Sequence, residues 1–229
     1  MDRYQIFGIF ALLLSVFLIV VFTNLSTESV LYIGGLVYAL VFIFHRPLER
    51  VLMPWIKRPL FAYGVFIVLN GLFIETLAYL SNLDRIHAGE KVFLFASSSL
   101  CVDLLIGLPY YLSFALLFAW AMKRYDLSTF QLGLIIWFAQ ASSTDMFSHF
   151  IPLFIGGVPG VVGFILAGFT MLFTLHTPTI LFDNRLREAY PNRSNSWLKY
   201  PVVIVMQVIP IIVTFIIAFV SFNLGIIKG

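Results

Sequence analysis

Long apolar runs dominate the sequence, and this feature restricts the fold more than any other. Hydrophobic residues make up 61% of the 229 residues and charged residues only 11%, whereas a soluble domain carries about 25% charged residues. Runs of about 20 apolar residues are typical of helices that cross a hydrocarbon core about 30 Å thick. Because the runs are continuous and do not alternate, they favour helices over a transmembrane β-barrel. The sequence therefore predicts an all-α, polytopic transmembrane helical bundle that forms a single integral membrane domain over residues 1–229.

Seven spans are predicted, and several of them begin or bend at residues with marked conformational preferences. Pro59 suits the first position of a helix, and Ser128 with Thr129 suits a cap before the fifth span. Pro109 and Pro210 lie inside spans, where proline bends or breaks a helix. The predicted spans cover residues 6–22, 30–44, 59–80, 92–122, 130–150, 151–182 and 201–227.

Basic residues are distributed unevenly between the two sides of the predicted membrane. With seven alternating spans, eleven of the 14 Lys and Arg residues fall on one side, at the N-terminus and in the loops around residues 46–58, 123–124 and 183–200. Cytoplasmic loops carry such an excess. We therefore expect the N-terminus in the cytoplasm and the C-terminus outside, in a plasma (inner) membrane. The same distribution explains the net charge of +3 as a topology signal, so no nucleic-acid partner is expected.

Two carboxylates, Glu75 and Asp103, lie inside predicted spans that contain no Lys or Arg. Charged groups in lipid are unfavourable, so they usually face a cavity or one another. Ser99 lies four residues before Asp103, which predicts a shared helix face. At a rise of about 1.5 Å per residue, further polar side chains share the outer half of the bilayer with these acids. The predicted substrate- or ion-binding residues are Glu75, Asp103, Asn70, Ser99, Gln140, Asp145 and His149.

These polar residues have two interpretations. In the first, they line an acidic cavity in the outer half of the bilayer that opens to the outside. In the second, neutral Glu75 and Asp103 form interhelical hydrogen bonds that only hold helices together. The protonation states of the two acids stay open.

Signatures of metal binding, disulfides and local catalytic motifs are weak in the sequence. Asp145 and His149 are spaced like a helical ligand pair, but a metal site usually needs a third ligand, so no metal site is predicted. The single cysteine, Cys101, excludes an intrachain disulfide and a CxxC site. No P-loop, HExxH or GxSxG signature occurs. The sequence identifies no cofactor and leaves open whether the chain is an enzyme.

The sixth predicted span carries small residues on one helical face. Gly156, Gly160 and Gly163 are spaced by four and three residues, which lets another backbone approach closely. This stripe indicates helix packing, a groove for a lipid or a flat ligand, or a subunit interface. The polar loop predicted over residues 183–200 is expected to be a solvated connector or a contact for anionic lipid headgroups.

Three functions are compatible with the sequence. We favour transport of a cation, a proton-coupled small solute or a lipid through the outer polar cavity. The first alternative is an intramembrane enzyme that acts on a lipid or isoprenoid, because acidic groups can perform general acid–base chemistry. The second is a structural or assembly subunit of a membrane complex. The expected partners are the lipid bilayer and a small solute, ion or lipid ligand, with a homo-oligomer or a membrane complex left open.

Overall fold

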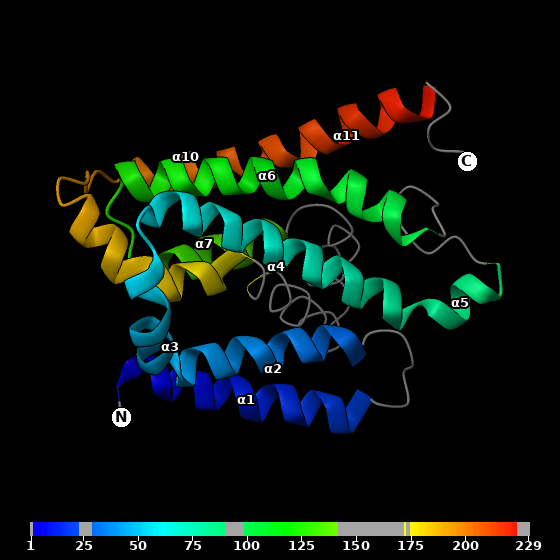
Figure 1. Ribbon diagram of the computed structural model, residues 1–229, viewed down its shortest axis with the longest axis horizontal. Helices are drawn as coiled ribbons and strands as arrows, with labels where there is room; N and C mark the ends of the chain where they lie inside the picture. Colours follow the sequence, from blue (N-terminus) through cyan, green and yellow to red (C-terminus); the bar gives the residue numbers. More distant parts are fainter. Residues whose placement is uncertain (1, 23–28, 90–98, 142–171, 173–174, 224–229) are drawn as a thin grey trace, which may run out of the picture.

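The computed structural model describes residues 2–22, 29–89, 99–141, 172 and 175–223. Within these ranges the regular structure is helical and no strand is formed, which confirms the predicted all-α class for this part of the chain. Figure 1 shows the long helices side by side. The helices are α1 (Arg3–Phe22), α2 (Ser29–Ile43), α3 (His45–Leu52), the 3₁₀ turn η1 (Met53–Trp55), α4 (Pro59–Ser81), α5 (Leu83–His87), α6 (Leu100–Arg124), α7 (Thr129–Ala141), a helix over residues 175–189, α10 (Lys199–Met206) and α11 (Val208–Asn223).

Three helices among the described residues are long and apolar enough to cross a membrane. They are Pro59–Leu80, Leu100–Arg124 and Lys199–Ser221, which correspond to α4, to α6 and to α10 with α11. Arg3–Phe17 and Ile33–Ile43 are apolar but shorter. These helices are compatible with a membrane protein. The count of seven spans stays a prediction, because most of residues 142–174 lie outside the described ranges.

Two helices begin with reciprocal caps. The Ser128 hydroxyl accepts a hydrogen bond from the Gln131 backbone N–H at 3.2 Å, and the Gln131 side-chain oxygen accepts one from the Ser128 N–H at 3.0 Å. This capping box confirms the cap predicted at the start of α7. Asp2 and Gln5 form the same arrangement at the start of α1, with both bonds at 3.0 Å. Pro59 lies in the first turn of α4, as predicted.

Proline has different effects in the two helices for which it was expected to matter. α6 continues through Pro109. The last predicted span is broken at Gln207, three residues before Pro210, into α10 and α11. A proline ring clashes with the carbonyl four residues earlier and removes one helical hydrogen bond. A break about one turn before Pro210 is therefore the expected effect of this proline.

The prediction of a polar loop over residues 183–200 is partly wrong, because the helix over residues 175–189 extends into the first third of that predicted loop. Two features of this segment stabilise helix. Asp183 and Arg187 pair at 3.0 Å with the i, i+4 spacing that supports a helix. Leu186 is fully buried, so the segment packs against the rest of the protein.

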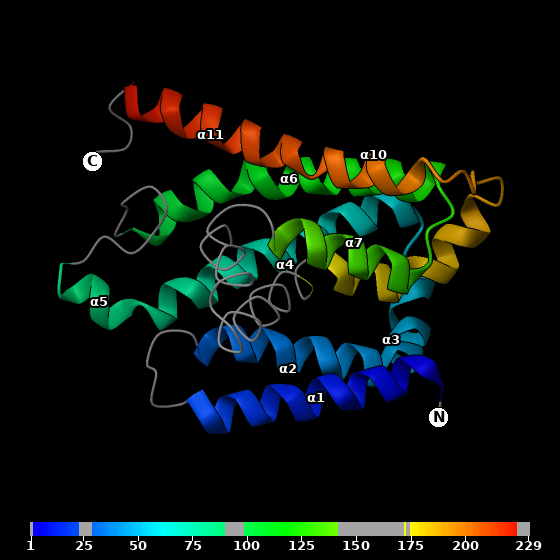
Figure 2. The ribbon, with the colours of Figure 1, turned by 180° about the vertical axis from the view of Figure 1, so that it is seen from behind.

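The long helices pack as two neighbouring pairs. α1 lies along α2, and α4 lies along α6. α2 also contacts α4, while α6 contacts α10 and α11, and α7 contacts α10. Figure 1 and the reverse view in Figure 2 show the same order across the bundle. Large rings fill the space between the helices, and the following are at most 2% exposed: Tyr38, Phe42, Tyr63, Tyr111, Phe114 and Phe118.

Large apolar side chains also cover the outer surfaces of the long helices. Phe61 of α4, Leu116 of α6 and Phe219 of α11 are each more than two-thirds exposed. Such surfaces are unfavourable in water, because the transfer of apolar area out of water is what stabilises a fold and these side chains would stay in contact with water. In a bilayer the same side chains contact hydrocarbon, which agrees with the membrane assignment of these three helices.

Candidate functional site

Glu75 lies between two of the helices that are long enough to cross a membrane. Its side chain is half-buried on α4. The Tyr111 hydroxyl of α6 donates a hydrogen bond to Glu75 Oε1 at 2.7 Å, and Tyr111 itself is only 1% exposed. Gly107, one turn before Tyr111, faces the same carboxyl, since a Cβ at this position would lie 3.6 Å from Glu75 Cγ, an ordinary contact distance. The structure thus holds an acid at the interface of α4 and α6.

A glycine on α4 makes this arrangement possible. Gly71 lies one turn before Glu75, and a Cβ at Gly71 would lie 2.2 Å from two atoms of the Tyr111 ring. The ring therefore packs directly on the backbone of α4. Because the ring is seated there, its hydroxyl reaches the carboxyl of Glu75 one turn further along the same helix.

The remaining predicted binding residues lie at different positions. Asn70 is half-buried on α4, five residues before Glu75. Ser99 is exposed and precedes α6 in an extended conformation, so it lies just outside the helix that carries Asp103. Asp103 belongs to α6 and Gln140 to α7, but their side chains are not among those described. Asp145, His149, Gly156, Gly160 and Gly163 lie outside the described residues.

Sequence analysis missed a buried polar network near the N-terminal end of the bundle. His176, 2% exposed, lies between Tyr38 of α2 and Thr129 of α7. A backbone carbonyl can only accept, so the bond to the Thr129 oxygen places a hydrogen on His176 Nε2. In a neutral imidazole Nδ1 then accepts, and the Tyr38 hydroxyl donates to it at 2.6 Å. A neutral His176 therefore has partners at both ring nitrogens.

The network continues from Thr129 into charged residues. The Thr129 hydroxyl donates to Asp183 Oδ2 at 3.1 Å. Arg187 donates to Asp183 Oδ1 at 3.0 Å, to Asp126, and to the Leu127 carbonyl at 2.9 Å. Burial opposes the charge of Arg187, but the carboxylates of Asp183 and Asp126 raise the pKa of its guanidinium above the usual value. These bonds tie α7 to the helix over residues 175–189.

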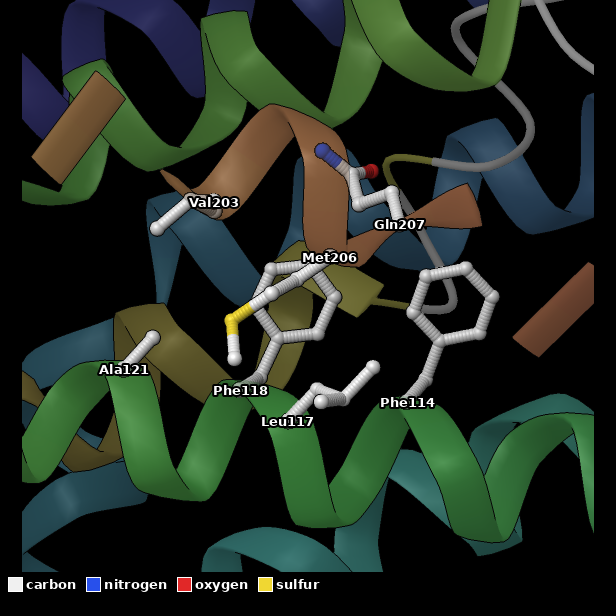
Figure 3. Close-up of a pocket in the computed structure, with 7 residues that line it drawn as sticks. All are labelled: Phe114, Leu117, Phe118, Ala121, Val203, Met206 and Gln207. Carbon is white, nitrogen blue, oxygen red and sulfur yellow. The ribbon is translucent and has the colours of Figure 1, made fainter. Parts of the chain in front are cut away.

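A small apolar pocket lies between α6 and α10. Its cavity volume is about 10 Å³, room for about one water molecule and far below the roughly 300–1,000 Å³ of typical ligand sites. Figure 3 shows the side chains of the two helices pointing toward each other across it. The Gln207 amide turns away from this pocket toward the Ile135 carbonyl, 3.4 Å distant. The lining residues are Phe114, Leu117, Phe118, Ala121, Val203, Met206 and Gln207.

The described part of the chain contains no group of three His, Cys, Asp or Glu side chains placed to hold a metal ion. The chain matches no protein-family model, and comparisons with curated proteins and with solved structures find no similar protein. Among the described side chains, the Glu75–Tyr111 pair joins a carboxyl and a hydroxyl between two apolar helices.

Proposed function

We propose that this chain is a multi-pass membrane transporter for a cation, a proton-coupled small solute or a lipid, and that Glu75 takes part in binding. The observation that carries this proposal is the hydrogen bond from Tyr111 to Glu75 between α4 and α6. Both helices are long and apolar enough to cross a membrane. Ionisable residues inside membrane helices usually mark pathways for ions, protons or substrates.

The chemistry of the pair suits a group that changes charge. A tyrosine hydroxyl donates to a carboxylate and accepts from a carboxylic acid, so Glu75 can keep a hydrogen bond in both protonation states. The predicted spans over residues 59–80 and 92–122 contain no Lys or Arg that would hold the carboxyl permanently ionised. The negative charge of the Glu75 carboxylate can therefore be neutralised either by a proton or by a cation.

The proposed topology has seven spans, with the N-terminus in the cytoplasm and the C-terminus outside a plasma (inner) membrane. α1, α4 and α10 begin, and α6 ends, at the end of the bundle where α3 also lies (Figure 1). The basic residues assigned to the cytoplasmic side belong to these helix ends and the adjoining loops, whereas Arg85 belongs to α5 at the opposite end. This separation of charge supports the orientation under the positive-inside rule.

Flux through proteoliposomes tests the proposal. Purified protein is reconstituted, and three probes are followed against protein-free liposomes: a trapped pH dye for protons, radioactive sodium for cations, and a fluorescent phospholipid for lipid movement. We expect one of these to move faster in the presence of the protein. Glu75→Gln should abolish that flux, because the amide cannot take up or release a proton or neutralise a cation. Flux equal to that of protein-free liposomes for all three probes would overturn the proposal.

Thr76→Val is a matched control on the same helix. Thr76 is half-buried and its hydroxyl donates to the Leu72 carbonyl one turn earlier, at 2.8 Å. Its replacement removes a polar group next to Glu75 without touching the carboxyl, so flux should persist. Equal flux in Glu75→Gln and Thr76→Val would remove Glu75 from the pathway.

A purely structural role for Glu75 makes a different prediction. The side-chain oxygen of glutamine still accepts from Tyr111, so Glu75→Gln should keep the stability of the fold. Tyr111→Phe removes the donor and should lower the free energy of unfolding by about 0.5–1.5 kcal/mol. A transporter shows lost flux in Glu75→Gln at unchanged stability. An assembly subunit shows only the stability change in Tyr111→Phe.

A further inference from the structure

Arg193 is a partly buried arginine whose guanidinium fork has no partner among the residues that the structure describes. It lies in the loop between the helix over residues 175–189 and α10. Its Nε donates to the Tyr190 carbonyl at 3.0 Å. Both terminal nitrogens, Nη1 and Nη2, are buried and have no hydrogen-bond partner. Folded proteins rarely leave buried donors unpaired, and an unpaired guanidinium is especially unfavourable.

The contrast with Arg187 shows that the nearby acids are already used. All three nitrogens of Arg187 are bound, to Asp183, Asp126 and the Leu127 carbonyl. Burial, followed by the positive charge of Arg187, holds the pKa of Arg193 below its usual value, although Asp183 and Asp126 partly oppose this effect. Arg193 therefore lies near one other cation, Arg187, and two carboxylates that Arg187 already binds.

We propose that Arg193 binds a phosphate group at this end of the helix bundle, from a lipid headgroup or from free inorganic phosphate. A guanidinium fork donates two parallel hydrogen bonds to two oxygens of a phosphate. Lys123 contacts a residue of the same loop, since its Nζ lies 5.8 Å from the ring centroid of Tyr190, whose carbonyl accepts from Arg193 Nε.

The loop allows a ligand to reach the fork. Asn192 and Ser194 on either side of Arg193 are exposed. Nη1 and Nη2 make no hydrogen bond within the described part of the chain, so a ligand that reaches them breaks none. Trp197 is 72% exposed in the same loop, as expected for a side chain at a membrane–water interface. A phosphate at this depth is within reach from the headgroup layer and from the water beside it.

Ligand-dependent thermal unfolding of the detergent-solubilised protein tests the site. Sodium phosphate is compared with sodium chloride at matched ionic strength, and phosphatidylglycerol with diacylglycerol of the same acyl chains. We expect the phosphate-bearing probe of at least one pair to raise the unfolding temperature, because a ligand of the folded state stabilises it. A shift with phosphatidylglycerol alone assigns a lipid headgroup, and a shift with inorganic phosphate assigns the free anion.

Two variants attribute the shift to the fork. Arg193→Gln should weaken phosphate binding about tenfold or more, because it removes charge-assisted hydrogen bonds. Arg185→Gln is the matched control, since Arg185 is an exposed arginine already paired with Glu188 at 3.0 Å, and it should keep the full shift. If Arg193→Gln does not fold, Arg193→Lys keeps the charge without the fork and should still bind more weakly than Arg185→Lys. No shift with either phosphate probe, or equal shifts in the Arg193 and Arg185 variants, would overturn the proposal.

Discussion

Gly71→Ala is the most direct test of the packing that positions Glu75. A Cβ at Gly71 would lie 2.2 Å from Cδ1 and Cγ of Tyr111. Carbon atoms in contact are normally about 3.5–4.0 Å apart, so the ring has to move by about 1 Å or more. Cγ is the ring atom nearest to the backbone of α6, and Tyr111 is only 1% exposed. The ring cannot move without separating the two helices or releasing its hydrogen bond to Glu75.

The expected change in the free energy of unfolding for Gly71→Ala has three contributions. Overpacking a tight interface costs about 1–3 kcal/mol, and loss of the Tyr111–Glu75 bond adds about 0.5–1.5 kcal/mol. Alanine is favoured over glycine inside a helix by about 0.5–1 kcal/mol, which opposes these effects. Gly71→Ala should therefore lower the free energy of unfolding by about 0.5–4 kcal/mol. Flux through the protein should fall together with the stability, because Glu75 loses Tyr111 as the partner that positions it.

Gly64→Ala is the control for this prediction. Gly64 lies on the same helix and faces the same neighbour, but its Cβ would lie 3.7 Å from the Ala115 Cβ, an ordinary contact. It should be neutral or stabilising by up to about 1 kcal/mol. Both variants can be compared by denaturant-induced unfolding in mixed micelles, followed by the far-ultraviolet circular dichroism of the helices. Equal stability of Gly71→Ala and Gly64→Ala would refute the packing argument.

Three further predictions concern the N-terminal end of the bundle. Gly133→Ala places a Cβ 2.7 Å from His176 Cε1, so it should displace the imidazole and destabilise the fold by about 1–3 kcal/mol in the same unfolding assay. Arg187→Leu leaves the buried Asp183 carboxylate without its cation and should cost about 1.5–3 kcal/mol, with replacement of the exposed Arg185 as a near-neutral reference. A backbone hydrogen bond, followed by neighbouring positive charges, holds the pKa of Asp2 below its usual value of 3.8, although burial partly opposes this. The stability advantage of the wild type over Asp2→Asn should therefore be present at neutral pH and disappear as the pH falls through that lowered value; an advantage that persists in acid would contradict it.

Local features of the fold were predictable from sequence because their causes are local. Pro59 starts α4 since proline fits the first helical turn. Ser128 caps α7 through a residue only three positions away. The helix boundaries at these two positions needed no knowledge of the rest of the chain. The sixth predicted span ended at residue 182, whereas the helix continues to residue 189. Residues 183–189 lack the apolar pattern from which spans are predicted, and the pairing of Asp183 with Arg187 stabilises the helix there.

The polar partnerships were not predictable, because they join residues far apart in the chain. Tyr38 and His176 are separated by 138 positions, and Tyr111 and Glu75 by 36. Sequence identified Glu75 as an acid in an apolar run, but Tyr111 carried no signal there because aromatic residues are common in these helices. The prediction for Glu75 used its position within an apolar span that contains no Lys or Arg. The identity of its partner depends on which faces of α4 and α6 meet, and Gly71 helps to determine this by the close approach that it permits.

Arg187 and Lys199 in one polar region and Glu75 in the other find their partners by different means, and the difference follows from position along the helices. At the N-terminal end, loops supply free backbone carbonyls, so Arg187 binds the oxygen of Leu127 and Lys199 that of Asp126. Within α4 and α6 the backbone N–H groups are used by the helices themselves, so the Glu75 carboxylate depends on a side-chain donor, the Tyr111 hydroxyl. A lysine in α6 would bring a second charge into an apolar interface, whereas tyrosine places its hydroxyl on an apolar ring. Tyr111 can therefore hold the carboxyl without fixing its charge, which is the property that binding and release of a proton or a cation requires.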